Sequence, residues 1–298
     1  MTDVVEFNDE TLGVWGEPIP FEVKRERISA YAAATNDPIT AHLDGDVAPP
    51  VFGIVPVFES MMEPCLEIVP MQVFGRGVHG EQDFHFHRPI RPGDTLVSRS
   101  RMTGYEALPN GTRTTIQLEC RTETGELVND QFVTVFFRTV DAGKTIGDLG
   151  PSHALVETLR GQSPVAKVDQ HVDADQTFRY SPASGDPMPI HLDEEVAKSA
   201  GLPGIIAHGL CTMAFTSWAV LTEVGSEDTT RLKRLAVRFN RMVMPDSDLS
   251  TTIWQGEHHA EGYTSYAFET TVGGEVVIKD GLAEIWDVEE LTHQRGAE

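Results

Sequence analysis

An aspartate and a histidine stand five positions apart twice in this chain, and a proline follows the aspartate each time. Residues 34–44 read ATNDPITAHLD and residues 183–193 read ASGDPMPIHLD. The two pairs are Asp37 with His42 and Asp186 with His191. A carboxylate and an imidazole that converge on one water can hold it and accept its proton, which is general acid–base chemistry. Positions five apart diverge on a regular helix or strand, so this chemistry needs an irregular loop.

Two prolines in the second copy favour such a loop. Pro187 disfavours helical geometry at Asp186, and Pro189 acts in the same way on the residue before it. A helix is expected to resume after Asp193, which is a good N-cap residue. The loop can therefore aim Asp186 and His191 at one point.

A buried helix is predicted to begin at Gly209, in the stretch IAHGLCTMAF. The following residues are apolar nearly all round, as in a helix buried on most sides, and Gly225 is a natural stop. The N–H of Gly209 is one of the unpaired donors at the positive end of this helix. Such a donor can stabilise negative charge on a carbonyl oxygen, as in an oxyanion hole. The combination predicts chemistry next to a carbonyl group.

The two motifs belong to a duplication of the chain. Residues 31–44 and 180–193 are identical at seven of fourteen positions, with a constant offset of 149. Further on, HFHRPIRPGDTL (85–96) matches RFNRMVMPDSDL (238–249). Two long copies predict two similar domains rather than a solenoid. We expect an N-terminal domain over 1–141, a linker over 142–163 and a C-terminal domain over 164–298.

Each copy is expected to run from a short extended entry and a short helix through an apolar segment into a meander of strands. Runs of β-branched and aromatic residues between turn signals predict the strands 85–90, 94–107, 113–124, 131–140, 234–243, 249–259, 263–272 and 275–287. A long buried helix followed by an antiparallel meander indicates a sheet curled around that helix.

Composition restricts the classes of partner. The 298 residues carry 46 acidic against 23 basic side chains, a formal net charge of −23, which argues against nucleic acid as a partner. The three cysteines are far apart and odd in number, which favours a reducing compartment. The N-terminus lacks a signal-peptide pattern and no apolar run is long enough for a bilayer. We expect a cytoplasmic protein without membrane insertion.

The stretch FRYSPASGDPMPIHLDEEVAKSAGLPGIIAHGLCTMAF (178–215) resembles the signature of the MaoC-like, (R)-specific enoyl-CoA hydratases/dehydratases. That signature has a tyrosine, then Gly-Asp-x-Asn-Pro-x-His-x-Asp, then a small residue and His-Gly-Leu at the start of the central helix. The match is close over about 180–215 and looser over the rest of the second half. The first half resembles the degenerate N-terminal half of two-domain members.

The resemblance implies an α+β double hotdog fold, with two antiparallel sheets each wrapped around a long central helix. It implies reversible syn addition of water to a trans-2-enoyl thioester, giving the (R)-3-hydroxyacyl thioester, with no metal or redox cofactor. Asp186 and His191 would bind the water, and the Gly209 N–H would stabilise the thioester enolate. The expected substrate is an acyl-CoA or an acyl carrier protein thioester, and a homodimer is expected by analogy of fold.

Two departures from the signature bear on the expected activity. Met188 stands where the family usually has asparagine, so a hydrogen bond from that side chain is lost. In the first copy, Phe52-Gly53 replaces His-Gly, while Asp37 and His42 keep their spacing. We expect the first copy to brace a loop around an acyl pocket; the alternative is a second working site.

Other residues have two interpretations each. His208 either lines the substrate pocket or is a structural histidine at the helix start, and Tyr180 is a core residue that also lines the pocket. Arg234 and Arg238, within RLKRLAVRFNR (231–241), could bind coenzyme A phosphates or be tied to neighbouring carboxylates. Asp83, His85 and His87 alternate along a predicted strand, a weak metal signal because their counterparts Ala236, Arg238 and Asn240 do not repeat it.

Two other functions compete with hydration. A hotdog thioesterase would use the same thioester pocket but attack the carbonyl. A non-catalytic acyl-thioester-binding subunit would explain Met188 and the divergence of the first copy.

Overall fold

The computed structural model describes residues 2–290 and separates them into two units that do not follow the order of the chain. Unit 1 contains Met1–Glu22, Pro56–His85 and Thr95–Ser152, and unit 2 contains Val23–Val55, Phe86–Asp94 and His153–Glu298. The motif loop of the first copy therefore lies in the same unit as the whole second copy. The proposed boundaries at 141 and 163 remain a prediction.

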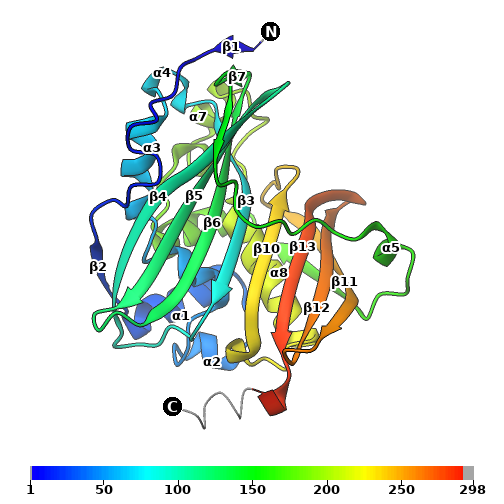
Figure 1. Ribbon diagram of the computed structural model, residues 1–298. Helices are drawn as coiled ribbons and strands as arrows, with labels where there is room; N and C mark the ends of the chain where they lie inside the picture. Colours follow the sequence, from blue (N-terminus) through cyan, green and yellow to red (C-terminus); the bar gives the residue numbers. More distant parts are fainter. Residues whose placement is uncertain (1, 291–298) are drawn as a thin grey trace. The chain divides into compact units, whose positions relative to one another are not determined.

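Unit 1 is built on an antiparallel sheet (Figure 1). Its strands follow the order β2 (Ile19–Glu22), β4 (Thr95–Leu108), β5 (Gly111–Thr122), β6 (Leu127–Arg138) and β3 (Gly77–Phe86). Shorter elements are β1 (Asp3–Val4), β7 (Val140–Asp141) and β8 (Thr145–Gly147), with helices η2 (Glu59–Met61), α3 (Met62–Ile68) and α4 (Met71–Phe74). The predicted strands of the first copy are confirmed in type, although β3 lies mostly before the expected 85–90.

Unit 2 contains five further long strands, which pair antiparallel with one another. Its strand order is β10 (Leu232–Phe239), β13 (Glu275–Trp286), β12 (Tyr263–Val272), β11 (Ser247–His259) and β9 (Ala166–Val172). Its helices are α1 (Arg25–Ala34), α2 (Thr40–Leu43), η1 (Pro50–Ile54), α5 (Glu157–Arg160), α6 (Gln176–Ser184), η3 (Pro189–His191), α7 (Glu194–Ser199), α8 (Gly209–Glu223) and η4 (Thr229–Arg231). The four predicted strands of the second copy are confirmed.

Helix α8 is the central helix of unit 2, and the sheet curves over it (Figure 1). It begins at Gly209 and ends at Glu223, as the sequence predicts, and eleven of its fifteen residues are buried. Gln170 of β9 reaches inward and donates a hydrogen bond to the carbonyl of Phe215 in the middle of the helix. A helix that is apolar on all sides forms here because every side is covered.

The first copy has no helix of comparable length among residues 2–290. The corresponding stretch forms η1, η2 and α3 instead. Pro56 and Pro64 lie within it, and each proline removes a backbone donor that a continuous helix would need. None of the described helices combines the length and the apolarity required to cross a bilayer.

Helices α1 and α6, the equivalent helices of the two copies, pack against each other within unit 2 and are joined by hydrogen bonds. Arg27 Nε donates to the carbonyl of Ala183, and Gln176 Nε2 donates to the carbonyl of Ala34. The two bonds are equivalent in the repeat, because Gln176 and Ala183 are the counterparts of Arg27 and Ala34 at the offset of 149. The hydroxyls of Tyr31 and Tyr180 meet between the helices at 3.2 Å. These reciprocal contacts fix the end of α6, from which the Asp186 loop departs.

Candidate active site

The loop that carries Asp186 starts at a tight turn. Gly185, with φ +87°, ends α6 in a left-handed conformation, which glycine adopts without strain. Asp186 then folds back on its own chain: one carboxylate oxygen accepts a hydrogen bond from Met188 N at 3.0 Å. Its carbonyl accepts a hydrogen bond from Ser181 Oγ at 2.7 Å. The half-buried carboxylate is therefore held through one oxygen, which leaves the other available to a ligand.

His191 lies in η3 and is held in one tautomer. Its Nδ1 lies 2.8 Å from the carbonyl of Ile206, and a carbonyl only accepts, so Nδ1 carries the proton. Nε2 then presents a lone pair. Burial lowers the pKa of His191 below its usual range, against opposing effects of the Ile206 carbonyl and the Asp186 charge. The imidazole is thus neutral at neutral pH and can act as a base.

Asp186, His191 and His208 come together at one place. One ligand atom from each lies within 4.8 Å of the other two. Within residues 2–290, the Asp186 carboxylate makes neither a hydrogen bond nor an ion pair with the imidazole of His191 or His208. Two atoms that share a water at about 2.8 Å each lie roughly 4.5 Å apart, so this separation suits a bridging water. The structure therefore brings Asp186 and His191 close together, and their role in catalysis stays a prediction.

His208 stacks on the histidine of the pair. The ring centroids of His191 and His208 are 3.8 Å apart with an interplanar angle of 27°, and the ring of Tyr180 packs at 4.9 Å on His208. Burial, and the neighbouring His191, lower the pKa of His208 to about 3, against a smaller effect of the Asp186 backbone. His208 is therefore an uncharged side chain at neutral pH.

The same three residues are the group whose atoms are near enough to hold a metal ion, within the described part of the chain. A metal bond to imidazole lies in the ring plane at about 2.0–2.1 Å. At that bond length two ligand atoms of one ion lie at most about 4.2 Å apart. The three atoms here lie within 4.8 Å of one another, a spacing that atoms hydrogen-bonded to one water also have.

Gly209 opens α8 with an uncapped end. His208 is the N-cap residue, and its side chain makes no capping hydrogen bond. The Gly209 N–H precedes the first intrahelical donors, so it remains available at the positive end of a 15-residue helix. A Cβ at this position would meet the Phe239 ring at 3.3 Å, which shows how closely the backbone approaches the sheet. The Gly209 N–H follows His208 directly in the chain, and the Asp186–His191 pair lies beside the His208 side chain.

Tyr180 is placed in the core. It is 1% exposed, its hydroxyl is bonded to Tyr31, and burial raises its pKa well above the usual range. Its ring packs on His208, and a contact with substrate remains a prediction. It is not placed to transfer a proton.

The first copy keeps its pair but uses it differently. Asp37 and His42 are 3% and 0% exposed, and Asp37 Oδ2 lies 2.7 Å from His42 Nδ1. The other nitrogen, Nε2, lies 2.6 Å from the hydroxyl of Thr229. Asp37 also accepts a hydrogen bond from Ile39 N, the counterpart of the bond from Met188 N. Both ring nitrogens of His42 are thus occupied, whereas His191 keeps one for a ligand.

The backbone changes the alignment of the first copy. Ala48 N bonds the carbonyl of Ile90 as Ala207 N bonds that of Val243, and η1 starts at Pro50 as α8 starts at Gly209. Pro49-Pro50, rather than Phe52-Gly53, therefore stands at the backbone position of His208-Gly209. The ring of Phe52 packs on Tyr31 as that of His208 packs on Tyr180. Proline has no N–H, so the first copy has no oxyanion donor at this position.

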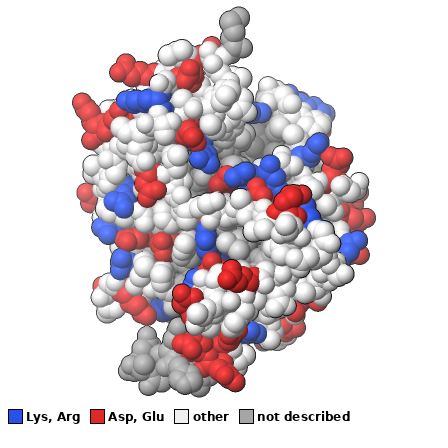
Figure 2. All heavy atoms as spheres, turned by 45° about the vertical axis from the view of Figure 1, so that its right-hand side comes forward, with Lys and Arg blue, Asp and Glu red and all other residues white. Residues whose placement is uncertain are grey.

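The basic cluster of β10 is paired with carboxylates of β13. Arg234 lies 3.8 Å from Glu284 and Arg238 lies 3.2 Å from Asp280, while Lys233 also pairs with Glu284. Basic and acidic side chains are interspersed over the face in Figure 2. Phe239 points to the start of α8, so the alternation of a strand directs Arg238 to the other face of the sheet. Arg238 therefore lies on the face of the sheet opposite the start of α8, and phosphate binding by Arg234 and Arg238 stays a prediction.

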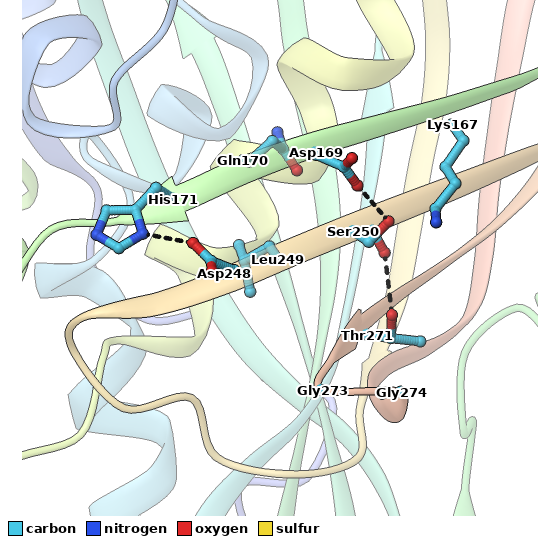
Figure 3. Close-up of a pocket in the computed structure, with 10 residues that line it drawn as sticks. All are labelled: Lys167, Asp169, Gln170, His171, Asp248, Leu249, Ser250, Thr271, Gly273 and Gly274. Carbon is cyan, nitrogen blue, oxygen red and sulfur yellow. Dashed lines mark hydrogen bonds and ion pairs between the residues drawn. The ribbon is translucent and has the colours of Figure 1, made fainter.

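An open hollow of about 620 Å³ lies on the sheet of unit 2, away from these residues (Figure 3). It is lined by Lys167, Asp169, Gln170, His171, Asp248, Leu249, Ser250, Thr271, Gly273 and Gly274. It shares no residue with the Asp186 site. His171 there donates to Asp248 at 2.7 Å.

Three positions around the site were not predicted. Arg27 hydrogen-bonds the end of α6, and the Ile206 carbonyl fixes the tautomer of His191. The hydroxyl of Thr229 hydrogen-bonds Nε2 of His42. The repeat offers a signal for Arg27, because its counterpart is Gln176, another long side chain with a terminal donor. A backbone carbonyl gives no signal of this kind.

Comparison with known proteins agrees with this fold. A family model described as a MaoC like domain matches residues 156–276, and one described as FAS1-like, dehydratase domain region matches 10–131. Over 283 residues the chain is 26% identical to "Probable enoyl-CoA hydratase 2" of Dictyostelium discoideum, covering 90% of this chain and 92% of that protein.

Over 212 residues the chain is 30% identical to "3-hydroxyacyl-thioester dehydratase Y" of Mycobacterium tuberculosis, covering 70% and 72% of the two chains. The crystal structure of a MaoC-like dehydratase from Phytophthora capsici matches with a TM-score of 0.80 at 22% identity, over 94% of this chain and 98% of that one. The fold is that of the double hotdog proteins. The chain belongs to the MaoC-like hydratase/dehydratase family, and it is an enzyme of the hydro-lyase class.

Proposed function

We propose that this protein catalyses the reversible hydration of a trans-2-enoyl-CoA to the (R)-3-hydroxyacyl-CoA at the Asp186–His191 pair. One observation carries the proposal: a carboxylate oxygen of Asp186 and a ring nitrogen of His191 lie within 4.8 Å of each other, and a backbone hydrogen bond holds each side chain. The names of the two relatives support the same reaction class.

Each of the three residues Asp186, His191 and Gly209 has a separate role in the proposed hydration. Asp186 and His191 hold the water, whose oxygen bonds to C3 while its proton passes to the pair. The negative charge that develops on the thioester oxygen is stabilised by the Gly209 N–H. A proton returned from the pair to C2 on the same face completes the addition. Atoms balance with water as the sole co-reactant, and the (R) product is the expectation for this family.

The first copy is proposed to support the acyl pocket rather than to catalyse. His42 has no lone pair left for a water, and Pro50 has no N–H for an oxyanion. Arg234 and Arg238 remain the proposed contacts for coenzyme A phosphates, although a phosphate would have to displace Glu284 or Asp280. A cytoplasmic location and a homodimer also remain proposals. The three cysteines are buried and form no disulfide in the described part of the chain, as is usual in a reducing compartment. One relative, from Arabidopsis thaliana, is named peroxisomal.

A spectrophotometric screen tests the function. Crotonyl-, longer-chain, branched and steroid-type enoyl-CoA substrates are offered to the wild-type protein, and the stereochemistry of the product is determined. We expect hydration of at least one substrate to the (R) product and a loss of about 10²-fold or more in kcat for His191→Ala, the usual effect of an acid–base group. Release of free coenzyme A from a saturated acyl-CoA would identify a thioesterase instead. Tight binding without turnover would identify a non-catalytic subunit.

A further inference from the structure

His208 has an unusual environment for a buried histidine. Its side chain is 2% exposed, yet neither ring nitrogen has a hydrogen-bond partner of good geometry. Buried polar atoms are nearly always satisfied by protein or ordered water. The Asp186 backbone is near enough to raise the pKa of the ring, so at least one nitrogen is left without a partner and could bind a ligand. The N-cap position offers an alternative, but the imidazole does not cap α8.

The site also lacks one expected contact. The signature's asparagine is Met188 here, and this side chain is 51% exposed and has no strong hydrogen-bonding atom. Asp186 and His191 alone give a water two partners. An ordered buried water usually has about three.

The positions of the three side chains allow His208 to be the third partner. Three atoms within 4.8 Å of one another all lie within about 2.8 Å (4.8/√3) of a common centre, and this is the length of a normal hydrogen bond. We infer that His208 is a catalytic residue that hydrogen-bonds the reacting water together with Asp186 and His191. This inference rests on the proposed hydratase function.

Two properties fit this role. A water whose proton passes to His191 and whose lone pair attacks C3 is best oriented by three fixed contacts rather than two. The pKa of about 3 keeps the His208 imidazole neutral, so it can hydrogen-bond the water without taking the proton that His191 must accept. The stacking on His191 holds the two rings in a fixed mutual orientation.

Three substitutions separate the hydrogen bond from the shape of the ring. His208→Phe keeps a flat buried ring and removes both nitrogens. His208→Asn places an amide group near the position of Nδ1, and His208→Gln places one near the position of Nε2, so each keeps a hydrogen-bonding group. We expect His208→Phe to lower kcat by about 10- to 10²-fold with little change in KM, since a lost buried hydrogen bond costs about 1–3 kcal/mol. At least one of the amide variants should recover several-fold of this loss.

A matched control is His171→Phe in the hollow of Figure 3, which makes the same chemical change outside the site. Thermal unfolding and circular dichroism check that each variant is folded. If His208→Phe unfolds, the comparison of the two amide variants with the wild type decides, because a purely structural histidine predicts an equal kcat per folded molecule.

The outcomes distinguish the two proposals. Wild-type hydration with a kcat for folded His208→Phe close to wild type, or a loss that neither amide variant recovers, would overturn the inference and leave the hydratase function standing. Absence of hydration by the wild type would overturn both. A loss confined to KM would show that His208 contacts the acyl substrate and not the water, which also contradicts the inference.

Discussion

Replacing Gly209 by proline removes one hydrogen atom that the proposed mechanism requires. The first copy already carries this change, since Pro50 starts η1 at the position where Gly209 starts α8. Proline is well tolerated at the first position of a helix. The preceding residue, His208, has φ −61° and ψ 135°, which is the extended geometry that proline favours in its neighbour.

The magnitude follows from the two parts of the change. Any side chain at 209 brings a Cβ to 3.3–3.4 Å from the Phe239 ring, so the ring must shift by a few tenths of an ångström. Gly209→Ala measures this steric part and keeps the N–H. Gly209→Pro adds the loss of the donor, for which one oxyanion contact is worth about 10²- to 10³-fold in kcat.

The assay compares kcat for enoyl-CoA hydration by the wild type, Gly209→Ala and Gly209→Pro, with thermal unfolding as the check on folding. We expect Gly209→Ala to lose less than about tenfold and Gly209→Pro to lose a further 10²-fold or more. Equal activity of the folded alanine and proline variants would refute the assignment of the Gly209 N–H.

Three further predictions concern stability and positioning. His42→Ala should lower the free energy of unfolding by about 3–5 kcal/mol in a denaturant titration, because Asp37 is left buried without its partner, while kcat per folded molecule stays within about threefold. The pKa values of His208 and His79 are lowered to about 3 and about 4, so the unfolded chain binds more protons below pH 6.5; the free energy of unfolding should therefore fall as the pH decreases from about 6.5 towards 4, and less steeply in His208→Phe. Arg27→Met should destabilise the protein by about 1 kcal/mol and lower kcat several-fold by releasing the end of α6, whereas Arg27→Gln, which copies Gln176, should retain most of both.

Local chemistry made much of the fold predictable. Asp193 caps α7 through bonds to Glu195 N and Val196 N, as its type and position indicated. The apolar run after His208 becomes α8 with the expected start. The alternating segments of the second copy become its four meander strands. In each case the signal lies within a few residues of the element that it specifies.

The remainder depends on contacts that no short stretch encodes. Whether His42 keeps a free nitrogen is decided by Thr229, 187 positions away. The equivalence of Pro50 and Gly209 follows from the backbone hydrogen bonds of Ala48 and Ala207. The sequence alone favours an alignment of Phe52-Gly53 with His208-Gly209. The tautomer of His191 depends on a main-chain carbonyl. These features decide which of two similar motifs can bind a water.

The asymmetry between the two motifs is tested most directly by the same substitution in both. Asp186→Asn and Asp37→Asn are isosteric, and each keeps an oxygen that can accept the local backbone N–H. We predict that Asp186→Asn loses about 10²-fold or more of the kcat for enoyl-CoA hydration, while folded Asp37→Asn remains close to the wild type. Full activity of Asp186→Asn, or an equal loss in both variants, would contradict the account.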